Sequence, residues 1–124
     1  MQVKFELLPG VLRVEIRERE TARETRDGAE AIFAERARHR VSAILLVVKE
    51  SRPIFKVEEY GLSELLTRIA AIPGLRVASV SDTAELYAAH QYIELLAKQR
   101  GIALRAFSSE REALEWLQKS HVEK

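Results

Sequence analysis

A short run of apolar residues limits most strongly what this chain can fold into. Residues 41–48 read VSAILLVV, and branched side chains make up most of the run. The run is far shorter than the ~20 residues of a membrane span, but it has the length of a β-strand. A strand without polar alternation is typical of the centre of a parallel sheet that helices cover on both faces. The run therefore predicts an α/β fold.

The rest of the chain shows strand and helix patterns around this run. Apolar and polar residues alternate over 1–8 and over 12–17, and Pro9-Gly10 suits the centre of a type II turn, which predicts an antiparallel hairpin. Further strands are expected at 75–80 and 102–107, and helices at 28–39, 62–69, 83–100 and 109–119. Some helical structure is also expected before residue 28. The expected N-caps are Thr25 or Asp27, Ser81 or Asp82, and Ser109 with Glu112 as its capping-box partner.

The element order is therefore β-β-α-β-α-β-α-β-α, in one domain that covers residues 1–124. Strands that alternate with helices imply right-handed crossovers and parallel pairing, and the hairpin adds an antiparallel strand. We expect a single mixed, mostly parallel five-stranded sheet with about four helices.

The composition excludes several classes of protein. The chain carries 20 basic and 19 acidic side chains, a net charge of +1, whereas a dedicated nucleic-acid binder is usually strongly basic. It has no cysteine, which rules out disulfides, cysteine zinc sites and thiol catalysis. The first residues lack the pattern of a signal peptide. We therefore expect a soluble cytoplasmic domain with no nucleic-acid partner and no integral membrane association.

No motif marks a catalytic centre or a cofactor site. The chain lacks the G-x-G-x-x-G, P-loop, G-x-S-x-G and H-E-x-x-H patterns. Its histidines, His39, His90 and His121, lie far apart and lack a second metal-type ligand at a productive helical spacing. His90 is expected to pack at the buried edge of its helix. We therefore expect no metal and no cofactor, and we rank an enzymatic activity last.

Six residues are expected to approach one another at the carboxyl edge of the sheet, where open α/β folds bind ligands. They are Ser51, Phe55, Tyr60, Ser81, Asp82 and Thr83. Phe55 and Tyr60 stand in the longest connection, and the sequence leaves two roles open for them: a local plug over the helix at 62–69, or part of a ligand or partner site. Asp82 is expected to cap the next helix, with ligand binding as the alternative.

The helix at 83–100 carries two apolar stripes. Leu86, Ala89, Ile93, Leu96 and Ala97 form the stripe that should face the sheet. Ala84, Ala88, Tyr92 and Leu95 form a second stripe, turned roughly 140–150° away. One helix cannot bury both stripes against the same sheet. The second should cover either a neighbouring element or a second copy of the chain, with Ala88, Tyr92 and Leu95 at a homodimer interface.

Several segments resemble one protein family. They are the hairpin LLPGVLRVEI, the strand end VVKE, and the stretches FKVEEYGLSELL, LRVASVSDTAE and LRAFSSEREALEWL. Together they look like the SpoIIAA-like family of bacterial proteins, and the resemblance covers nearly the whole chain. Its most recognisable mark is the C-terminal pattern Phe107, Glu110, Glu112, Ala113, Trp116 and Leu117. The resemblance implies a fold related to STAS and SEC14-like domains.

The resemblance also implies a possible phosphorylation switch, from which this sequence departs. STAS proteins that antagonise anti-sigma factors present a phosphorylatable serine before a Gly-Leu pair at a helix N-terminus. Here Tyr60 takes the place of that serine before Gly61-Leu62, and Ser63 follows within the expected helix. The departure speaks against the switch. A changed ligand stays possible, because a helix N-terminus favours an anion.

Two functions follow from these observations. The first is a non-catalytic binding or regulatory module that acts through protein–protein contacts, which the resemblance, the missing catalytic motifs and the second stripe favour. The alternative is a carrier of a small apolar or anionic ligand at the carboxyl edge of the sheet, since SEC14-like relatives hold apolar ligands. A carrier requires a cavity between the helices and the sheet, and the many alanines of the helices either leave room for one or allow close packing.

Overall fold

The computed structural model describes residues 1–54, 56 and 61–122, and the elements form there in the predicted order. The strands are β1 (Gln2–Leu8), β2 (Val11–Arg17), β3 (Ala43–Lys49), β4 (Arg76–Ser81) and β5 (Ala103–Phe107). The helices are α1 (Ala22–His39), α2 (Leu62–Ala70), α3 (Ala84–Gln99) and α4 (Glu110–Val122). Among these described helices, none combines the length and the hydrophobicity that a membrane crossing needs.

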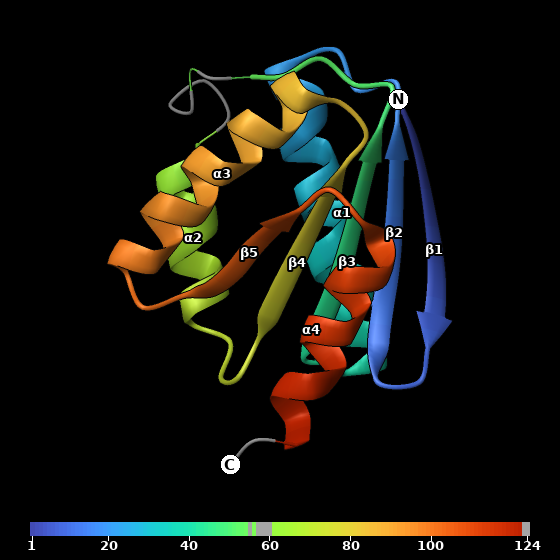
Figure 1. Cartoon of the computed structure of the whole chain (residues 1–124), viewed down its shortest axis with the longest axis vertical. Helices are drawn as coiled ribbons and strands as arrows, with labels where there is room; N and C mark the ends of the chain where they lie inside the picture. The colour runs from blue at the N-terminus through green and yellow to red at the C-terminus, as the bar shows by residue number, and fades with distance from the viewer. Residues whose placement is uncertain (55, 57–60, 123–124) are drawn as a thin grey trace.

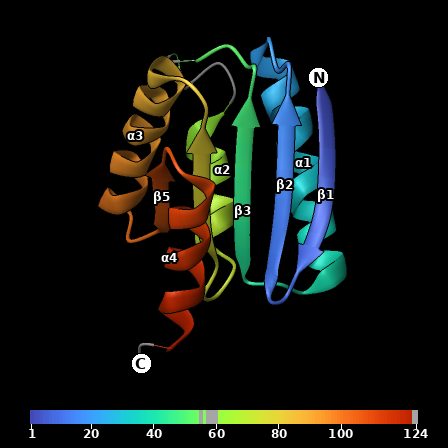
Figure 2. The same cartoon turned by 45° about the vertical axis from the view of Figure 1, so that its right-hand side comes forward.

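The five strands lie in one mixed sheet in chain order, which confirms the predicted fold class. β1 runs antiparallel to β2, and each later pair is parallel. Each crossover therefore leads to the next strand of the sheet, always in the same direction across it. Right-handed crossovers that all run in one direction place their helices on the same face of the sheet. Figures 1 and 2 show α1 and α2 behind the sheet, with α3 on the same side near β5 and α4 alone on the opposite face.

β3 occupies the centre of the sheet, as the run at 41–48 predicts. Leu45 and Val47 are buried in the cluster that α4 completes. Ile44, on the other side of the strand, is buried in a cluster that includes residues of α1 and α2. The strand is apolar on both sides because helices cover both of its faces.

A two-residue turn closes the hairpin between β1 and β2. Pro9 and Gly10 separate Leu8 from Val11, which face each other in register. Gly10 has a φ of 72°, the left-handed value that a type II turn needs at its third position. Glycine adopts this value without a Cβ clash, so the geometry agrees with the predicted turn.

The first helix begins at Ala22, six residues earlier than predicted, and neither Thr25 nor Asp27 caps it. Thr21 is the N-cap. Its hydroxyl accepts the Glu24 N–H at 3.1 Å, and the Glu24 carboxylate accepts the Thr21 N–H at 3.1 Å. This capping box satisfies N–H groups that a helix start leaves without partners. The predicted start and caps are wrong because the first turns of α1 are dense in charge and show too little apolar periodicity, and the helical structure expected before residue 28 belongs to the same helix.

Thr83, rather than Ser81 or Asp82, caps α3. The Thr83 hydroxyl accepts the Leu86 N–H at 3.1 Å. The Asp82 carboxylate instead accepts the Glu50 N–H at 3.0 Å and ties the end of β4 to the residue that follows β3. The sequence offers three adjacent capping residues, and the neighbouring strand end engages the aspartate.

The C-terminal pattern that carries the family resemblance packs α4 onto the sheet. Ser109 accepts the Glu112 N–H at 3.3 Å, which is one of the two hydrogen bonds of the predicted capping box. Ala113 and Leu117 are buried within the α4 cluster. Phe107 and Trp116 lie against each other, with 5.9 Å between their ring centroids. The conspicuous residues of this pattern therefore have structural roles.

An arginine of β2 fastens the start of α4 to the sheet. Arg13 donates to both carboxylate oxygens of Glu110, from Nε at 2.6 Å and from Nη2 at 3.1 Å. Nη2 also donates to Glu15 at 3.0 Å. The hydrogen bond from Arg13 holds the pKa of Glu110 below its usual value. The pair therefore stabilises the folded chain at neutral pH, and protonation of Glu110 removes that stabilisation as the pH falls.

Replacing Glu110 tests this contact. We expect Glu110→Gln to lower the free energy of unfolding by about 1 kcal/mol more than Glu112→Gln does at neutral pH. Both glutamates stand in the first turn of α4, so the control removes the shared interaction with the helix dipole. Urea unfolding followed by circular dichroism measures both values. Equal losses in the two variants would contradict the role assigned to Arg13.

Candidate functional site

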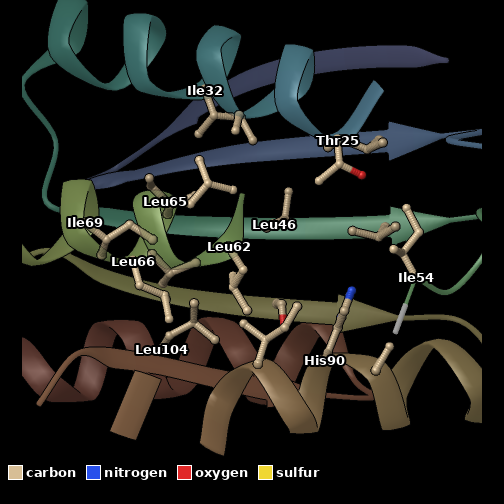
Figure 3. Close-up of a pocket in the computed structure, with 18 of the residues that line it drawn as sticks. Thr25, Ile32, Leu46, Ile54, Leu62, Leu65, Leu66, Ile69, His90 and Leu104 are labelled. Atoms are coloured by element: carbon tan, nitrogen blue, oxygen red, sulfur yellow. The ribbon is translucent and has the colours of Figure 1, made fainter. Parts of the chain in front are cut away.

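A largely apolar cavity of about 170 Å³ lies between the sheet and the three helices on one of its faces. Its apolar lining includes Ile32 of α1, Leu46 of β3, Leu104 of β5, and Leu62, Leu65, Leu66 and Ile69 of α2. Figure 3 shows these side chains around a common interior. Ala29 of α1 and Ala89 of α3 also line the cavity and contribute only a methyl group each. These short side chains leave space that larger ones would fill.

Four of the described residues bring polar side chains to the same cavity: Arg19, Thr25, Ser79 and His90. Arg19 follows the end of β2, and Ser79 stands two residues before the end of β4. Thr25 and His90 lie in the first two turns of α1 and α3. Figure 3 shows Thr25 and His90 toward the carboxyl ends of the strands, and Ile69 and Leu104 farther from those ends. The cavity therefore has an apolar body and a more polar end.

His90 reaches the cavity from α3 and is 6% exposed, so its predicted burial is confirmed. Figure 3 shows its ring turned away from the helix into the interior. Its Nδ1 atom has no hydrogen-bond partner among the described residues. Burial, together with the positive charge of Arg19, lowers the pKa of His90 to about 4. The ring is therefore neutral at pH 7 and offers one donor and one acceptor nitrogen.

Ser79 brings a second polar group to the cavity. Its side chain is buried, with 4% of the residue exposed, and its hydroxyl has no hydrogen-bond partner among the described residues. A buried hydroxyl without a partner costs about 1–3 kcal/mol. The neighbouring residues Ala78 and Val80 pack in the α4 cluster, as expected for the other side of the strand. Ser79 thus stands where an apolar residue would stabilise the core better.

Arg19 is held at the carboxyl edge by contacts with the residues that follow β3. Its N–H donates to the Ser51 hydroxyl at 3.1 Å, and its carbonyl accepts the Arg52 N–H at 3.0 Å. Its guanidinium also donates to the Arg52 carbonyl. Arg19 is nearly buried. A positive charge therefore borders the polar end of the cavity.

The predicted edge residues that the structure describes mostly bind nearby backbone. Ser51 accepts the Arg19 N–H and donates to the Lys49 carbonyl at 2.9 Å. Asp82 and Thr83 hold the loop after β3 and the start of α3, as described above. Their oxygens join the ends of neighbouring strands to the elements that follow.

The remaining predicted edge residues differ in what the structure describes. Ser81 is buried, and its hydroxyl has no hydrogen-bond partner among the described residues. It lies two residues beyond Ser79, so its side chain is on the same side of β4. Phe55 and Tyr60 lie outside the described residues.

The two stripes of α3 have different surroundings. Leu86, Ala89 and Ala97 of the first stripe are buried, as predicted. Every member of the second stripe is exposed, including Tyr92 at 43% and Leu95 at 52%. The expectation that a neighbouring element covers this stripe is therefore wrong for the described part of the chain. A homodimer through Ala88, Tyr92 and Leu95 stays a prediction.

The sequence analysis named a cavity between the helices and the sheet only as what a carrier would require, and it did not indicate the polar residues of the cavity as a site. Two signals were present: a serine on the helix-facing side of a buried strand, and a histidine at a core position of α3, four residues after Leu86. Each residue alone is common in a protein core. Their meeting depends on how α1 and α3 sit on the sheet, which local patterns do not specify.

A search of protein-family models found no match to this chain, and no curated protein matched it. The resemblance to the SpoIIAA-like family therefore stays a prediction. The function has to be inferred from the site itself.

Replacing His90 should change how stability depends on pH. The pKa of His90 is about 4 in the folded chain, against an ordinary value of 6.5. The unfolded chain therefore takes up the proton first as the pH falls, and the folded chain loses stability between these two values, by about 3 kcal/mol at most. His90→Leu should remove this loss, because leucine binds no proton.

Urea unfolding at several pH values between these limits measures the effect. His39→Leu is the control for the loss of a histidine, since His39 is exposed on α1. The same decline in His90→Leu as in the wild type would show that His90 does not titrate as a buried group.

Proposed function

We propose that this chain is a binding module that takes up a small apolar molecule in the cavity between α1, α2, α3 and the sheet. The observation that carries the proposal is an apolar cavity of about 170 Å³ bordered by two buried polar groups without hydrogen-bond partners among the described residues. Apolar ligand sites commonly combine a hydrophobic lining with a few placed polar groups. The SEC14-like side of the family resemblance agrees with such a role.

The size of the cavity indicates the size of the ligand. An engineered cavity of about 150 Å³ in another protein stays dry and binds benzene. A cavity of about 170 Å³ therefore suits a molecule of one ring, or a short branched chain.

The polar end indicates what else the ligand carries. Nδ1 of His90 and the hydroxyl of Ser79 each lack a partner among the described residues, and the imidazole is neutral at pH 7. One hydrogen-bonding group on the ligand would remove part of the cost of burying them. The positive charge of Arg19 nearby favours a group with an oxygen acceptor. We therefore expect phenol to bind more tightly than benzene.

Filling the cavity tests the proposal. Ala29→Leu places a larger side chain into the space, and Ala31→Leu makes the same change on the exposed side of α1. Benzene should raise the midpoint of thermal unfolding for the wild type and for Ala31→Leu, because a ligand that binds only the folded state stabilises it. It should not raise the midpoint of Ala29→Leu.

Thermal unfolding followed by circular dichroism, with and without benzene or phenol near their solubility limits, gives these midpoints. Midpoints that neither compound changes in the wild type would show that the cavity takes up no such molecule. An equal rise in Ala29→Leu and the wild type would show that binding occurs elsewhere.

A second candidate function is contact with another protein, which the exposed second stripe of α3 favours. Ala84, Ala88, Tyr92 and Leu95 form an apolar stripe with no covering element among the described residues. A second copy of the chain is the partner expected from the sequence.

Both proposals take the chain to act in the bacterial cytoplasm, as its composition and the family resemblance suggest.

Charged substitutions test the second candidate. Tyr92→Lys combined with Leu95→Glu should lower the mass of the assembly measured by sedimentation at high protein concentration, because charged side chains oppose burial of the stripe. Both residues are exposed, so circular dichroism should not change. An assembly of unchanged mass would rule out contact through this stripe.

A further inference from the structure

The outer edge of β1 has no neighbouring strand in the described part of the chain. β1 is the last strand on its side of the sheet and forms the right-hand border of the molecule in Figure 1. Its seven residues pair one to one with β2, so no bulge bends it away, and it contains no proline. Natural sheets usually block such an edge, because its unpaired N–H and C=O groups accept a further strand.

The hairpin geometry determines which backbone groups this edge offers. Leu8 and Val11 flank a two-residue turn, and in such hairpins the flanking residues form a hydrogen-bonded pair. Pairs along an antiparallel ladder alternate between hydrogen-bonded and non-hydrogen-bonded types. The N–H and C=O groups of Val3, Phe5 and Leu7 therefore point outward from the sheet.

The side chains of β1 divide between the two faces of the sheet. Val3 and Phe5 pack against the buried cluster that contains Ile44 and includes residues of α1 and α2. Leu7 lies on the same side of the strand, yet it is 54% exposed. Lys4 and Glu6 project from the other face and are exposed. The edge thus combines an uncovered leucine with one charge of each sign.

A second copy of β1 can pair antiparallel with this edge in three registers in which most of the two strands overlap. In each register the outward N–H and C=O groups of one copy meet those of the other. A twofold axis at Lys4 sets two lysines opposite each other, and an axis at Glu6 sets two glutamates opposite each other. Like charges in directly opposite positions destabilise a sheet. An axis at Phe5 instead sets each Lys4 opposite Glu6 of the other copy, and each Val3 opposite Leu7.

We propose that β1 pairs with β1 of a second copy of this chain, antiparallel about a twofold axis at Phe5. The two sheets then form one continuous sheet. The register joins opposite charges at two non-hydrogen-bonded positions, where side chains approach most closely, and it covers Leu7 on the other face. Such a self-complementary contact closes as a dimer. The α3 stripe lies at the opposite end of the sheet from β1, so the two contacts are independent (Figure 1).

Exchanging the two charges tests the register. The parent is the chain with Tyr92→Lys and Leu95→Glu, in which the α3 stripe does not contribute, and we expect this parent to be dimeric. Lys4→Glu alone and Glu6→Lys alone each set like charges opposite one another, so each should raise the dissociation constant of the dimer about tenfold. The two changes together restore opposite charges and should restore the dimer.

Mixing the two single variants gives an internal control. Each strand of one variant then carries charges opposite to those of the other, so a heterodimer should form where neither variant pairs well with itself. Sedimentation equilibrium measures every dissociation constant. Positions 4 and 6 also lie opposite Glu15 and Arg13 within the hairpin, so thermal unfolding is followed and all comparisons use a temperature at which every variant is folded.

Two results would overturn the proposal. One is a parent chain that stays monomeric at the highest concentration at which it remains soluble. The other is a dimer whose dissociation constant is the same in the parent, in both single variants and in the double exchange.

Discussion

The common direction of the three crossovers is the constraint on which the rest of this structure depends. Each crossover steps to the adjacent strand, so α1, α2 and α3 share one face of the sheet and leave the other to α4. On its own face, α4 has Arg13 of β2 to fix its start. On the shared face, Leu66 of α2 and Ala97 of α3 belong to one buried cluster. The cavity lies where these helices, α1 and the sheet do not fill the space between them.

The residues at the polar end of the cavity oppose stability. An apolar residue in place of Ser79 would remove a buried hydroxyl that has no partner among the described residues, and one in place of His90 would remove a buried ring whose charging destabilises the fold. A core selected for stability alone would have apolar residues at these positions. A ligand with a hydrogen-bonding group is the physical reason that we offer for their presence. The same reasoning explains the small side chains at Ala29 and Ala89, which keep the space open.

The structure follows the sequence-based predictions where burial produces a local pattern of apolar residues. It departs from them where a contact joins residues that are distant in the chain or where no apolar pattern marks the element. The run at 41–48 identified the central strand because covering both faces of a strand requires apolar residues on both sides. The start of α1 was misplaced because a capping box between Thr21 and Glu24, and not an apolar stripe, begins that helix. The partner of Asp82 was missed because Glu50 comes from a neighbouring strand end, 32 residues away in the chain. The cavity depends on the volumes of side chains from three helices, and no periodicity in one segment describes that sum.

A crystal of the chain pressurised with xenon would test most directly whether the cavity is an apolar binding site. Xenon binds in apolar cavities of this size, and it does not bind in polar cavities that are filled with water. We predict a single strong xenon peak between α2 and the sheet, in contact with Leu66 and Ile69 and away from His90. Two results would contradict the proposal. One is a cavity filled with ordered water molecules that bind Ser79 and His90, and the other is a cavity that side chains close so that no xenon binds.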